Sequence, residues 1–408
     1  MSSPSSESHP GFGATVAALS FGQLVSWAAL YYTFTSMVLP MQRELGWSNT
    51  VLMGAFTLAL AVWGAASYAV GAAIDRGHGR AVMTTGSVFA ALSFVLWSQA
   101  VSPWMLYAAG VAMGIAMAMT LYDPAFSVLT RRYPERYREG ITTLTLVGGF
   151  ASTLAFPVVA SLLACCGWRG TLLFIAGGLL LVIAPLHAWA LRGPALVAAP
   201  AGVDESSDST LRQALNTRAF WLLATAFTFF AFATAALWSH AMPAFASKGV
   251  SDAQVLVVLM CVGPAQVAAR LFYAGLLRLG WRISLHRLGV FVLAGLPLGL
   301  TLFALADSMA LLVVFALLFG FANGLVTIVR GGLVPEYFGR TNIGRIGGAL
   351  SAIALFARAA APLAAAWLLL PLPGYRELVL VLAGLGVVAL LAFALAHAPA
   401  AVLDGASR

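Results

Sequence analysis

Three arginines lie inside long apolar stretches of the sequence: Arg270, Arg330 and Arg358. A guanidinium stays protonated in a protein, so it cannot become neutral to suit an apolar environment. Placing such a cation within a membrane helix costs about 2.5–3.5 kcal/mol, so it usually faces a cavity or a charged partner. Arg330 stands only a few residues from the expected end of its helix, where its side chain can reach the polar boundary. We therefore assign Arg330 a structural role and take Arg270 and Arg358 as candidate binding residues.

The acidic residues within these stretches are too few to neutralise the arginines. Of the 14 Asp and Glu residues, only Asp123, in LYDPAF, is expected to be buried. Arginine binds a carboxylate through two parallel hydrogen bonds, so the surplus positive charge predicts a small anionic ligand. An alternative stays open, in which Arg358 bonds helix carbonyls and Asp123. Asp123 has two interpretations: a counter-ion for Arg330 or a loop arginine, or a group that binds and releases a proton.

Two kinds of ring side chain add further candidates. Tyr31 and Tyr32 could donate hydroxyl hydrogen bonds to a bound carboxylate, and Trp27 shares a helix face with Tyr31. Aromatic packing, or a belt at the membrane interface, is the alternative for these rings. His240, near one end of its helix, is either a candidate proton carrier or an ordinary interfacial histidine.

The elements that position these residues follow from composition. The 408-residue chain is 61% hydrophobic and 9% charged, whereas a soluble domain has roughly 25% charged residues. Twelve apolar stretches, of about 20 residues or more each, match the ~30 Å hydrocarbon core of a bilayer. Their apolar residues run continuously and the backbone must bond internally in lipid, so these stretches are predicted to be helices. The expected fold is an all-α membrane protein with twelve transmembrane helices in two six-helix bundles.

One long polar segment divides the chain. Residues 192–217 are rich in Gly, Pro, Ser and acidic residues, which is typical of a flexible linker. The predicted division is an N-terminal tail at 1–13, a first bundle at 14–191, the linker at 192–217, a second bundle at 218–398 and a C-terminal tail at 399–408. An offset of 204 residues maps Gly71 to Gly275 and Gly140 to Gly344, which indicates that the second half repeats the first.

The basic residues are distributed unequally over the connections. Of the 22 Lys and Arg residues, 15 fall on the side of the termini and the linker, 4 on the other side and 3 within helices. Cytoplasmic loops carry the excess of Lys and Arg in membrane proteins. The distribution therefore predicts that both termini and the linker are cytoplasmic, and the net charge of +8 reflects topology rather than nucleic-acid binding.

The stretch GAAIDRGHGR, at 71–80, connects the second and third expected helices. An ordinary charged turn is one interpretation, because small residues allow close helix approach and charges mark the membrane edge. The pattern resembles the GxxxDRxGRR loop of the major facilitator superfamily, with His78 as a departure. That resemblance covers nearly the whole chain and implies a gate on the cytoplasmic side. The residues implied in this gate are Gly71, Asp75, Arg76, Gly79 and Arg80.

Two further stretches resemble the bacterial monocarboxylate transporter group of that superfamily: YTFTSMVLPMQRELGWS at 32–48 and AARLFYAGLL at 268–277. The related oxalate/formate exchangers carry one cation in helix 8 and another in helix 11, which Arg270 and Arg358 match. Gln266 stands where proton-coupled members carry an aspartate.

The resemblance implies a function as well as a fold. It implies a monomeric secondary transporter in a bacterial-type inner membrane, which carries a small organic anion such as a monocarboxylate by alternating access. Protons are a further candidate partner. The alternative is a proton-driven exporter of drugs or other amphipathic compounds, which would require more buried acids than this sequence has.

No sequence pattern indicates an enzyme or a bound cofactor. There is no GxxxxGK[ST] phosphate-binding loop. Cys165, Cys166 and Cys261 lack the CxxC or Cys/His spacing of a metal site and are expected to be apolar fillers. We therefore predict no cofactor, no metal and no nucleic-acid partner, so an anionic small molecule and the lipid bilayer are the expected partners.

Overall fold

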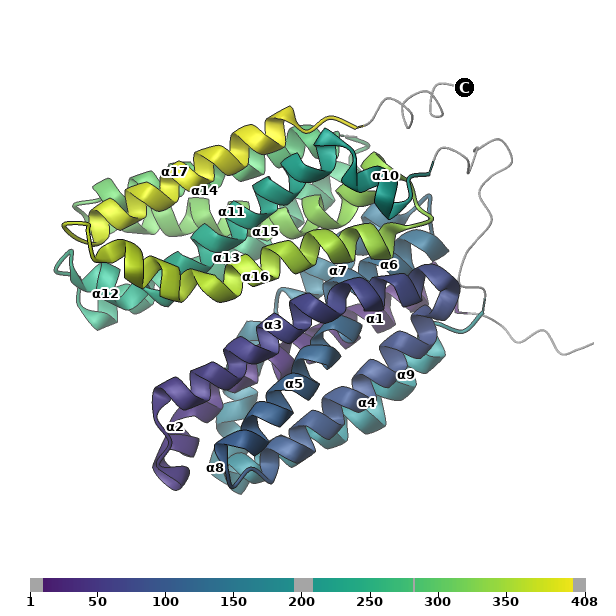
Figure 1. The fold of residues 1–408 in the computed structure, drawn as a ribbon, viewed down its shortest axis with the longest axis horizontal. Helices are drawn as coiled ribbons and strands as arrows, with labels where there is room; N and C mark the ends of the chain where they lie inside the picture. Colours follow the sequence, from purple (N-terminus) through teal and green to yellow (C-terminus); the bar gives the residue numbers. More distant parts are fainter. Residues whose placement is uncertain (1–9, 194–207, 282, 399–408) are drawn as a thin grey trace, which may run out of the picture.

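The computed structural model describes residues 10–193, 208–281 and 283–398, and these are almost entirely helical. The predicted C-terminal tail lies outside the described residues, as do most of the predicted N-terminal tail and linker. Figure 1 shows two groups of helices, one from each half of the chain.

The helices of the first half run from Phe12 to Ala190 and include three short π-helical turns. In order they are α1 (Phe12–Trp27), η1 (Ala28–Tyr32), α2 (Thr33–Leu45), α3 (Asn49–Ala73), η2 (Ile74–His78), α4 (Gly79–Ser98), α5 (Pro103–Thr120), α6 (Tyr122–Arg132), α7 (Tyr137–Gly148), α8 (Ala151–Gly178), η3 (Leu179–Ile183) and α9 (Ala184–Ala190).

The second half begins with a short helix in the predicted linker and continues with long ones. In order they are α10 (Leu211–Leu215), α11 (Arg218–Ser239), α12 (Ala241–Ala246), α13 (Asp252–Arg278), α14 (Leu285–Leu305), α15 (Met309–Phe338), α16 (Ile343–Leu369) and α17 (Tyr375–Leu395).

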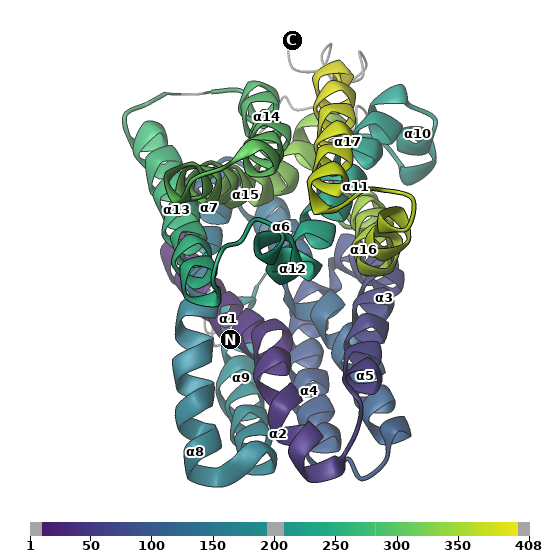
Figure 2. The ribbon, with the colours of Figure 1, turned by 90° about the vertical axis from the view of Figure 1, so that its left-hand side faces the viewer.

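The helices of the described residues are long and apolar enough for twelve membrane crossings, the number that the sequence predicts. Within the described ranges, ten helical stretches are long and apolar enough to cross. Two of them, Thr50–Ser98 and Tyr137–Ala190, have 49 and 54 residues, which is more than twice the ~20 needed for one crossing. Each contains a glycine with positive φ, Gly77 at 91° and Gly167 at 64°. The chain turns back at these glycines, as Figure 2 shows for α8, so each stretch makes two crossings.

Polar side chains and glycines set several helix ends. The Ser48 hydroxyl accepts a hydrogen bond from the Val51 N–H at the start of α3, and Thr217 does the same for Phe220 at the start of α11. These caps satisfy N–H groups that have no partner within the helix. Gly46, with φ 69°, ends α2 in the left-handed conformation that glycine adopts readily.

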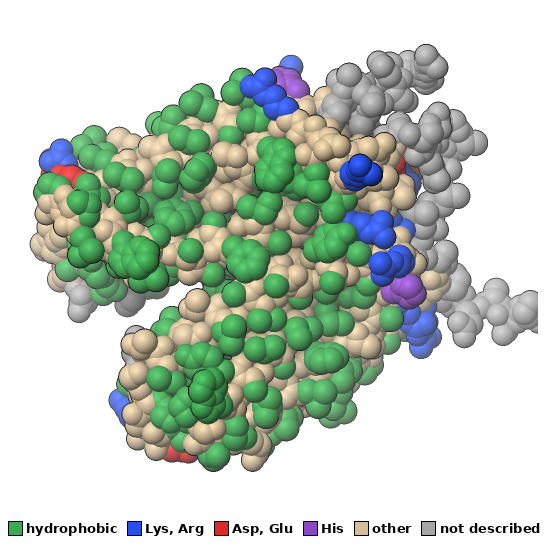
Figure 3. Space-filling view, in the orientation of Figure 1, with side chains coloured by type: hydrophobic (Ala, Val, Ile, Leu, Met, Phe, Trp, Pro, Cys, Tyr) green, Lys and Arg blue, Asp and Glu red, His purple; other side chains and the backbone are tan. Residues whose placement is uncertain are grey.

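The two bundles converge at one end of the molecule and separate at the other. The converging end, which we call the closed end, holds α10 and the loop at 339–342 between α15 and α16 (Figure 1). The opposite, open end holds α2, α12 and the turn of α8. The space-filling view shows a hollow between the bundles at the open end (Figure 3). Helix α3 packs against α16 across the boundary between bundles.

Candidate functional site

A cavity of about 200 Å³ lies between the two bundles. All of its charged lining residues are cations from the second half: Arg270 of α13, Arg330 of α15 and Arg358 of α16. The described lining contains no Asp or Glu. Because carboxylates are absent from the walls, the cavity has the charge of an anion site.

Arg270 is deeply buried and only partly satisfied. Its side chain is 4% exposed, and its Nε donates to the Gly324 carbonyl at 3.0 Å. Its Nη1 has no hydrogen-bond partner among the described residues. This nitrogen lies beside Gly149 of the first half, where even a Cβ would collide with it. The guanidinium therefore reaches across the boundary between bundles and keeps a free donor there.

Arg358 lies far from both ends of its helix. It stands 15 residues after Ile343 and 11 before Leu369, which corresponds to roughly 22 and 16 Å along the helix axis. The side chain is half-buried, lines the cavity and makes no hydrogen bond or ion pair with any described residue. The open alternative, in which Arg358 bonds helix carbonyls and Asp123, is therefore not the arrangement found.

Arg330 has a different environment from the one expected. Rather than reaching the membrane boundary, its side chain lines the cavity and its Nη2 donates to Asp123 Oδ1 at 2.6 Å. The two side chains are 27% and 19% exposed, and Asp123 Oδ2 has no partner among the described residues. Asp123 belongs to α6 of the first half, so this ion pair joins the bundles. Asp123 is thus paired with Arg330, and no carboxylate of the described residues pairs with the other two guanidiniums.

A π-helical turn decides which tyrosine lines the cavity. Residues 28–32 form this turn, in which the Thr33 hydroxyl donates to the Ala28 carbonyl at 2.9 Å. Such a turn adds a residue to the helical repeat and rotates the side chains that follow. As a result Tyr32 lines the cavity. Tyr31 instead packs against Phe56, with ring centroids 5.6 Å apart.

His240 lies away from the cavity. It ends α11 at the open end, where its Nε2 lies 3.1 Å from the Pro362 carbonyl and its ring packs on Tyr375. These contacts are those of an interfacial histidine in the second half.

Several lining residues escaped the sequence reasoning. They come from aromatic, amide and glycine positions that helical periodicity does not distinguish from ordinary packing. The main ones are Trp63, Tyr122, Gly149, Asn323 and Thr327. The pair Gly148–Gly149 was the available signal, because two consecutive glycines interrupt a helix. In the structure they lie at the break between α7 and α8, and Gly149 is beside the buried Arg270.

Gly149→Ala is expected to displace the Arg270 guanidinium, because the added Cβ would overlap Nη1. The end of a flexible side chain can move, so the protein should fold while anion binding weakens about tenfold, the loss of one charge-assisted hydrogen bond. Isothermal titration of the purified protein measures this. Gly177→Ala, which adds a Cβ in open space in the same half, is the matched control. Equal affinities in both variants would contradict this role of Gly149.

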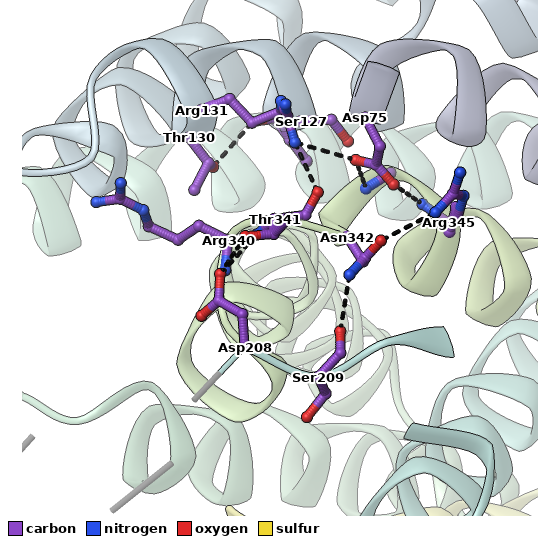
Figure 4. Close-up of polar contacts among 12 residues, drawn as sticks. Asp75, Ser127, Thr130, Arg131, Asp208, Ser209, Arg340, Thr341, Asn342 and Arg345 are labelled. Carbon is purple, nitrogen blue, oxygen red and sulfur yellow. Dashed lines mark hydrogen bonds and ion pairs between the residues drawn. The ribbon is translucent and has the colours of Figure 1, made fainter. Parts of the chain in front are cut away.

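A second polar cluster joins the bundles at the closed end (Figure 4). Asp75 accepts hydrogen bonds from the backbone N–H groups of Gly344 and Arg345, both at 2.8 Å, at the start of α16. Arg131 lies 3.6 Å from Asp75 and donates to the Thr341 carbonyl at 2.6 Å. Asp75 thus caps a helix of the other bundle, where the helix dipole favours a negative charge.

The end of the linker supports the same loop. Asp208 accepts from the backbone N–H groups of Arg340 and Thr341, at 2.9 and 2.8 Å, and from the Thr341 hydroxyl at 2.6 Å. Gly339 has φ 79° and lies so close to this carboxylate that a Cβ would collide with it. Asp208 therefore holds the loop in the position that Arg131 and Asp75 contact. The sequence reasoning treated Asp208 only as part of a flexible linker.

The other residues of the 71–80 stretch have distinct surroundings. Gly71 lies against Gly344 so closely that a Cβ on either would overlap the other's carbonyl. Gly79 leaves space for Val128, and Arg80 Nε donates to the Ala188 carbonyl at 2.8 Å. Arg76 is exposed on the surface. Gly71 and Asp75 therefore join the bundles, whereas Gly79 and Arg80 act within the first one.

Asp75→Ala is expected to loosen the closed end, because the start of α16 loses its cap. The reporter is a cysteine introduced by Ser67→Cys, at a position whose backbone contacts Gly348 across the boundary between bundles. A lost cap costs about 0.5–2 kcal/mol, so this cysteine should react roughly 2- to 30-fold faster with a thiol reagent. The background has the three native cysteines replaced. Glu139→Ala, which removes an exposed acid paired within its own helix, should leave the rate unchanged. An unchanged rate in Asp75→Ala would show that the cap does not hold the closed end.

Among the described residues, no group of three or more His, Cys, Asp and Glu side chains could hold a metal ion. The three cysteines are free.

Comparison with known structures gives the same fold at low sequence identity. The human organic anion transporter MFSD10 (TETRAN) superposes with a TM-score of 0.70 at 18% identity, over 94% of this chain and all (100%) of that one. A variant of the Escherichia coli fucose:proton symporter FucP gives 0.71 at 14% identity, over 94% and 98% of the two chains. A structure of FucP in the outward conformation gives 0.70 at 14% identity, over 94% and 98%.

Sequence comparison identifies the family. Comparison with curated proteins finds no match. The Major Facilitator Superfamily pattern, however, matches residues 19–294, which is more than half of the chain. Together with twelve crossings in two bundles around a central cavity, this match means that the chain is a multi-pass membrane protein and not an enzyme: it belongs to the major facilitator superfamily of secondary transporters.

Proposed function

We propose that this protein transports a small organic anion, with a carboxylate as its charged group, by alternating access of the cavity between the bundles. The observation that carries the proposal is the charge of that cavity: three guanidiniums line it, and its described lining has no carboxylate. The proposal also assigns the chain to the monocarboxylate transporter and oxalate/formate exchanger group. The identities of 18% and 14% with solved transporters support the fold alone, so the substrate is argued from the cavity.

Arg270 and Arg358 are the proposed anion-binding residues. Arg358 has no protein partner among the described residues, and Arg270 has a free Nη1. Guanidinium and carboxylate match in shape and charge, and their pairing is strong where water is scarce. Tyr32 of the first half faces the same cavity and would assist as a hydrogen-bond donor, with Tyr31 packed behind it. An anion held from both bundles would couple its binding to their rearrangement.

The proposed orientation has both termini in the cytoplasm of a bacterial-type inner membrane. In Figure 3 the visible Lys and Arg side chains gather mainly toward the closed end, where α10 lies. An excess of basic residues favours the cytoplasmic side. The open end would then face the outside, and the conformation described would be the outward-open state of a monomeric transporter.

A proton-driven exporter of amphipathic compounds is the rival function. It would require acidic side chains that face the cavity, and the described lining has none. Asp123 is the nearest candidate, but its carboxylate is paired with Arg330. No observation in the cavity favours the rival.

Ligand-induced stabilisation of the purified protein tests the proposal. A ligand that binds only the folded state stabilises it and so raises the melting temperature. At a ligand concentration of 100 times the Kd, the free energy of unfolding increases by about 2.7 kcal/mol. We expect stabilisation by carboxylates, and exchange of a labelled carboxylate by protein reconstituted in vesicles. Stabilisation by organic cations alone would contradict the proposal and favour the exporter.

Asp123→Asn addresses proton coupling, for which Asp123 is the proposed group. We expect the variant to keep exchange of labelled substrate but to lose the pH dependence of net transport, because the amide that replaces the carboxylate neither binds nor releases a proton. The measurement is uptake as a function of pH. His240→Gln is the comparison, since His240 lies outside the cavity. If Asp123→Asn retains the wild-type pH dependence, Asp123 is not the coupling group.

A further inference from the structure

We infer that the carried anion is an arene carboxylate, a flat aromatic ring bearing a carboxylate. The inference rests on the proposed function and narrows its substrate class. It starts from a difference between the two walls of the central cavity. The second half supplies every charged lining residue, whereas the first half supplies four aromatic rings and two glycines: Trp27, Tyr32, Trp63, Tyr122, Gly148 and Gly149.

The aromatic wall is fixed by contacts among its own rings. Trp27 is central, with ring centroids 5.9 Å from Trp63 and 5.0 Å from Tyr122. Tyr122 is in turn stacked on Phe126, at 5.3 Å and an interplanar angle of 10°. Rings held in this way present flat faces and edges without losing further freedom when a ligand binds.

Three buried nitrogens in the lining have no acceptor among the described residues. Trp63 and Arg270 are both 4% exposed. Trp27 Nε1, Trp63 Nε1 and Arg270 Nη1 have no hydrogen-bond partner among the described residues. Buried donors are nearly always satisfied in proteins. Two lie on the aromatic wall and one on the cationic wall, so a ligand that reaches both walls would accept hydrogen bonds from both sides.

The size and charge of the cavity then select the ligand. Acetate or formate would leave most of the ~200 Å³ unfilled and could not touch both walls. A flat ring stacks or meets other rings edge-on at centroid distances of 4.5–7 Å, and it has no internal rotations to freeze. Phe227 and Phe230 of α11 add rings on the other side. Aromatic cations would suit the rings, but the three guanidiniums would repel them.

The guanidiniums can divide their roles toward such a ligand. Arg270 and Arg358 have no carboxylate partner among the described residues and would bind the carboxylate of the ligand. Arg330 already has Asp123 as its partner, and an arginine in this state can still lie flat against an aromatic face. A ring-bearing anion therefore uses all three cations, whereas an aliphatic acid uses two.

The test compares matched ligands by isothermal titration of the full-length purified protein. The probes are benzoate, cyclohexanecarboxylate, acetate, benzamide and benzylammonium. We expect benzoate to bind about 2- to 12-fold more tightly than cyclohexanecarboxylate, the difference that aromatic contacts add to burial. Acetate and benzamide, which lack the ring and the charge respectively, should bind about 100-fold more weakly than benzoate.

One variant locates the preference on the aromatic wall. Trp63→Leu should bring the ratio between benzoate and cyclohexanecarboxylate close to one. Trp104→Leu, at a tryptophan of α5 that is 83% exposed, should keep the wild-type ratio. If Trp63→Leu does not fold, the ligand series with the wild-type protein still decides the question.

The outcomes separate this inference from the proposed function. Benzoate binding with the expected ratios supports both. If acetate or cyclohexanecarboxylate binds as tightly as benzoate, the arene inference fails and the anion proposal stands. If no carboxylate binds, whether or not benzylammonium does, both fail.

Discussion

Arg358→Ala is expected to reduce anion transport about 100-fold or more, while the protein still folds and inserts in the membrane. The guanidinium has no partner among the described residues, so its removal breaks no contact that holds the bundles together. What is lost is the pairing with the substrate, which comprises two hydrogen bonds to a charged group at about 1.5–3 kcal/mol each. Arg270→Ala should have a similar effect on transport. Uptake of labelled carboxylate by vesicles with equal amounts of inserted protein measures both.

Matched variants show whether charge or shape is decisive. Arg358→Lys keeps the charge but loses the planar fork, so it should recover only part of the activity. Arg287→Ala removes an exposed arginine near the start of α14 and should transport like the wild type. Wild-type rates in both Arg358→Ala and Arg270→Ala would show that the anion binds elsewhere.

Gly71→Ala is expected to reduce transport at least tenfold by preventing the bundles from meeting at the closed end. A Cβ at Gly71 would overlap the carbonyl of Gly344, and one at Gly344 would overlap the carbonyl of Gly71. Both obstacles are helix backbone, which cannot turn aside as a side chain can. Inserting a methyl group into such a contact costs about 1–3 kcal/mol, and only the state with this end closed bears that cost.

The internal repeat provides the control for this variant. Gly275 stands 204 residues after Gly71, in the corresponding place of the second half, and a Cβ there meets nothing within 4 Å. Gly275→Ala should therefore transport normally. Gly71→Ala should transport slowly, and in a Ser67→Cys background the introduced cysteine should react faster with a thiol reagent. If the two alanine variants behave alike, the close approach of α3 and α16 does not limit transport.

The helices were predictable from the sequence because a bilayer imposes strong rules on them. Apolar stretches of sufficient length, with polar connections, gave the twelve crossings and the two bundles. Helix ends were less predictable: α1 begins at Phe12, before the predicted bundle start at 14, and α2 continues to Leu45, beyond the charged Arg43 and Glu44. The breakers near those positions do not fix the ends, since α1 includes Gly13 and α2 includes Pro40, and an amphipathic end such as the one with Arg43 can extend beyond the apolar stretch.

The cavity was predictable in part. Arg270 and Arg358 could be singled out because an uncompensated cation in an apolar helix needs an explanation. The side of the helix that Arg330 faces could not be derived, since a position near a helix end allows either direction. Of the two tyrosine candidates, Tyr31 and Tyr32, only Tyr32 lines the cavity, and this choice depends on a π-helical turn that leaves no clear mark in AALYY. Contacts between residues far apart in the sequence, such as those of Asp208 with Arg340 and Thr341, depend on the fold as a whole.

The surplus of cations has a consequence for how the membrane potential acts on this protein. Three guanidiniums and one carboxylate give the region around the cavity two formal positive charges when it is empty. Moving one charge through 100 mV changes the free energy by about 2.3 kcal/mol. A bound monovalent anion lowers the charge that moves with the cavity, so the voltage acts most strongly on the return of the empty carrier. One-for-one exchange of such anions would then be electrically silent, as would net transport of one anion with one proton, whereas net transport of the anion alone would carry a current.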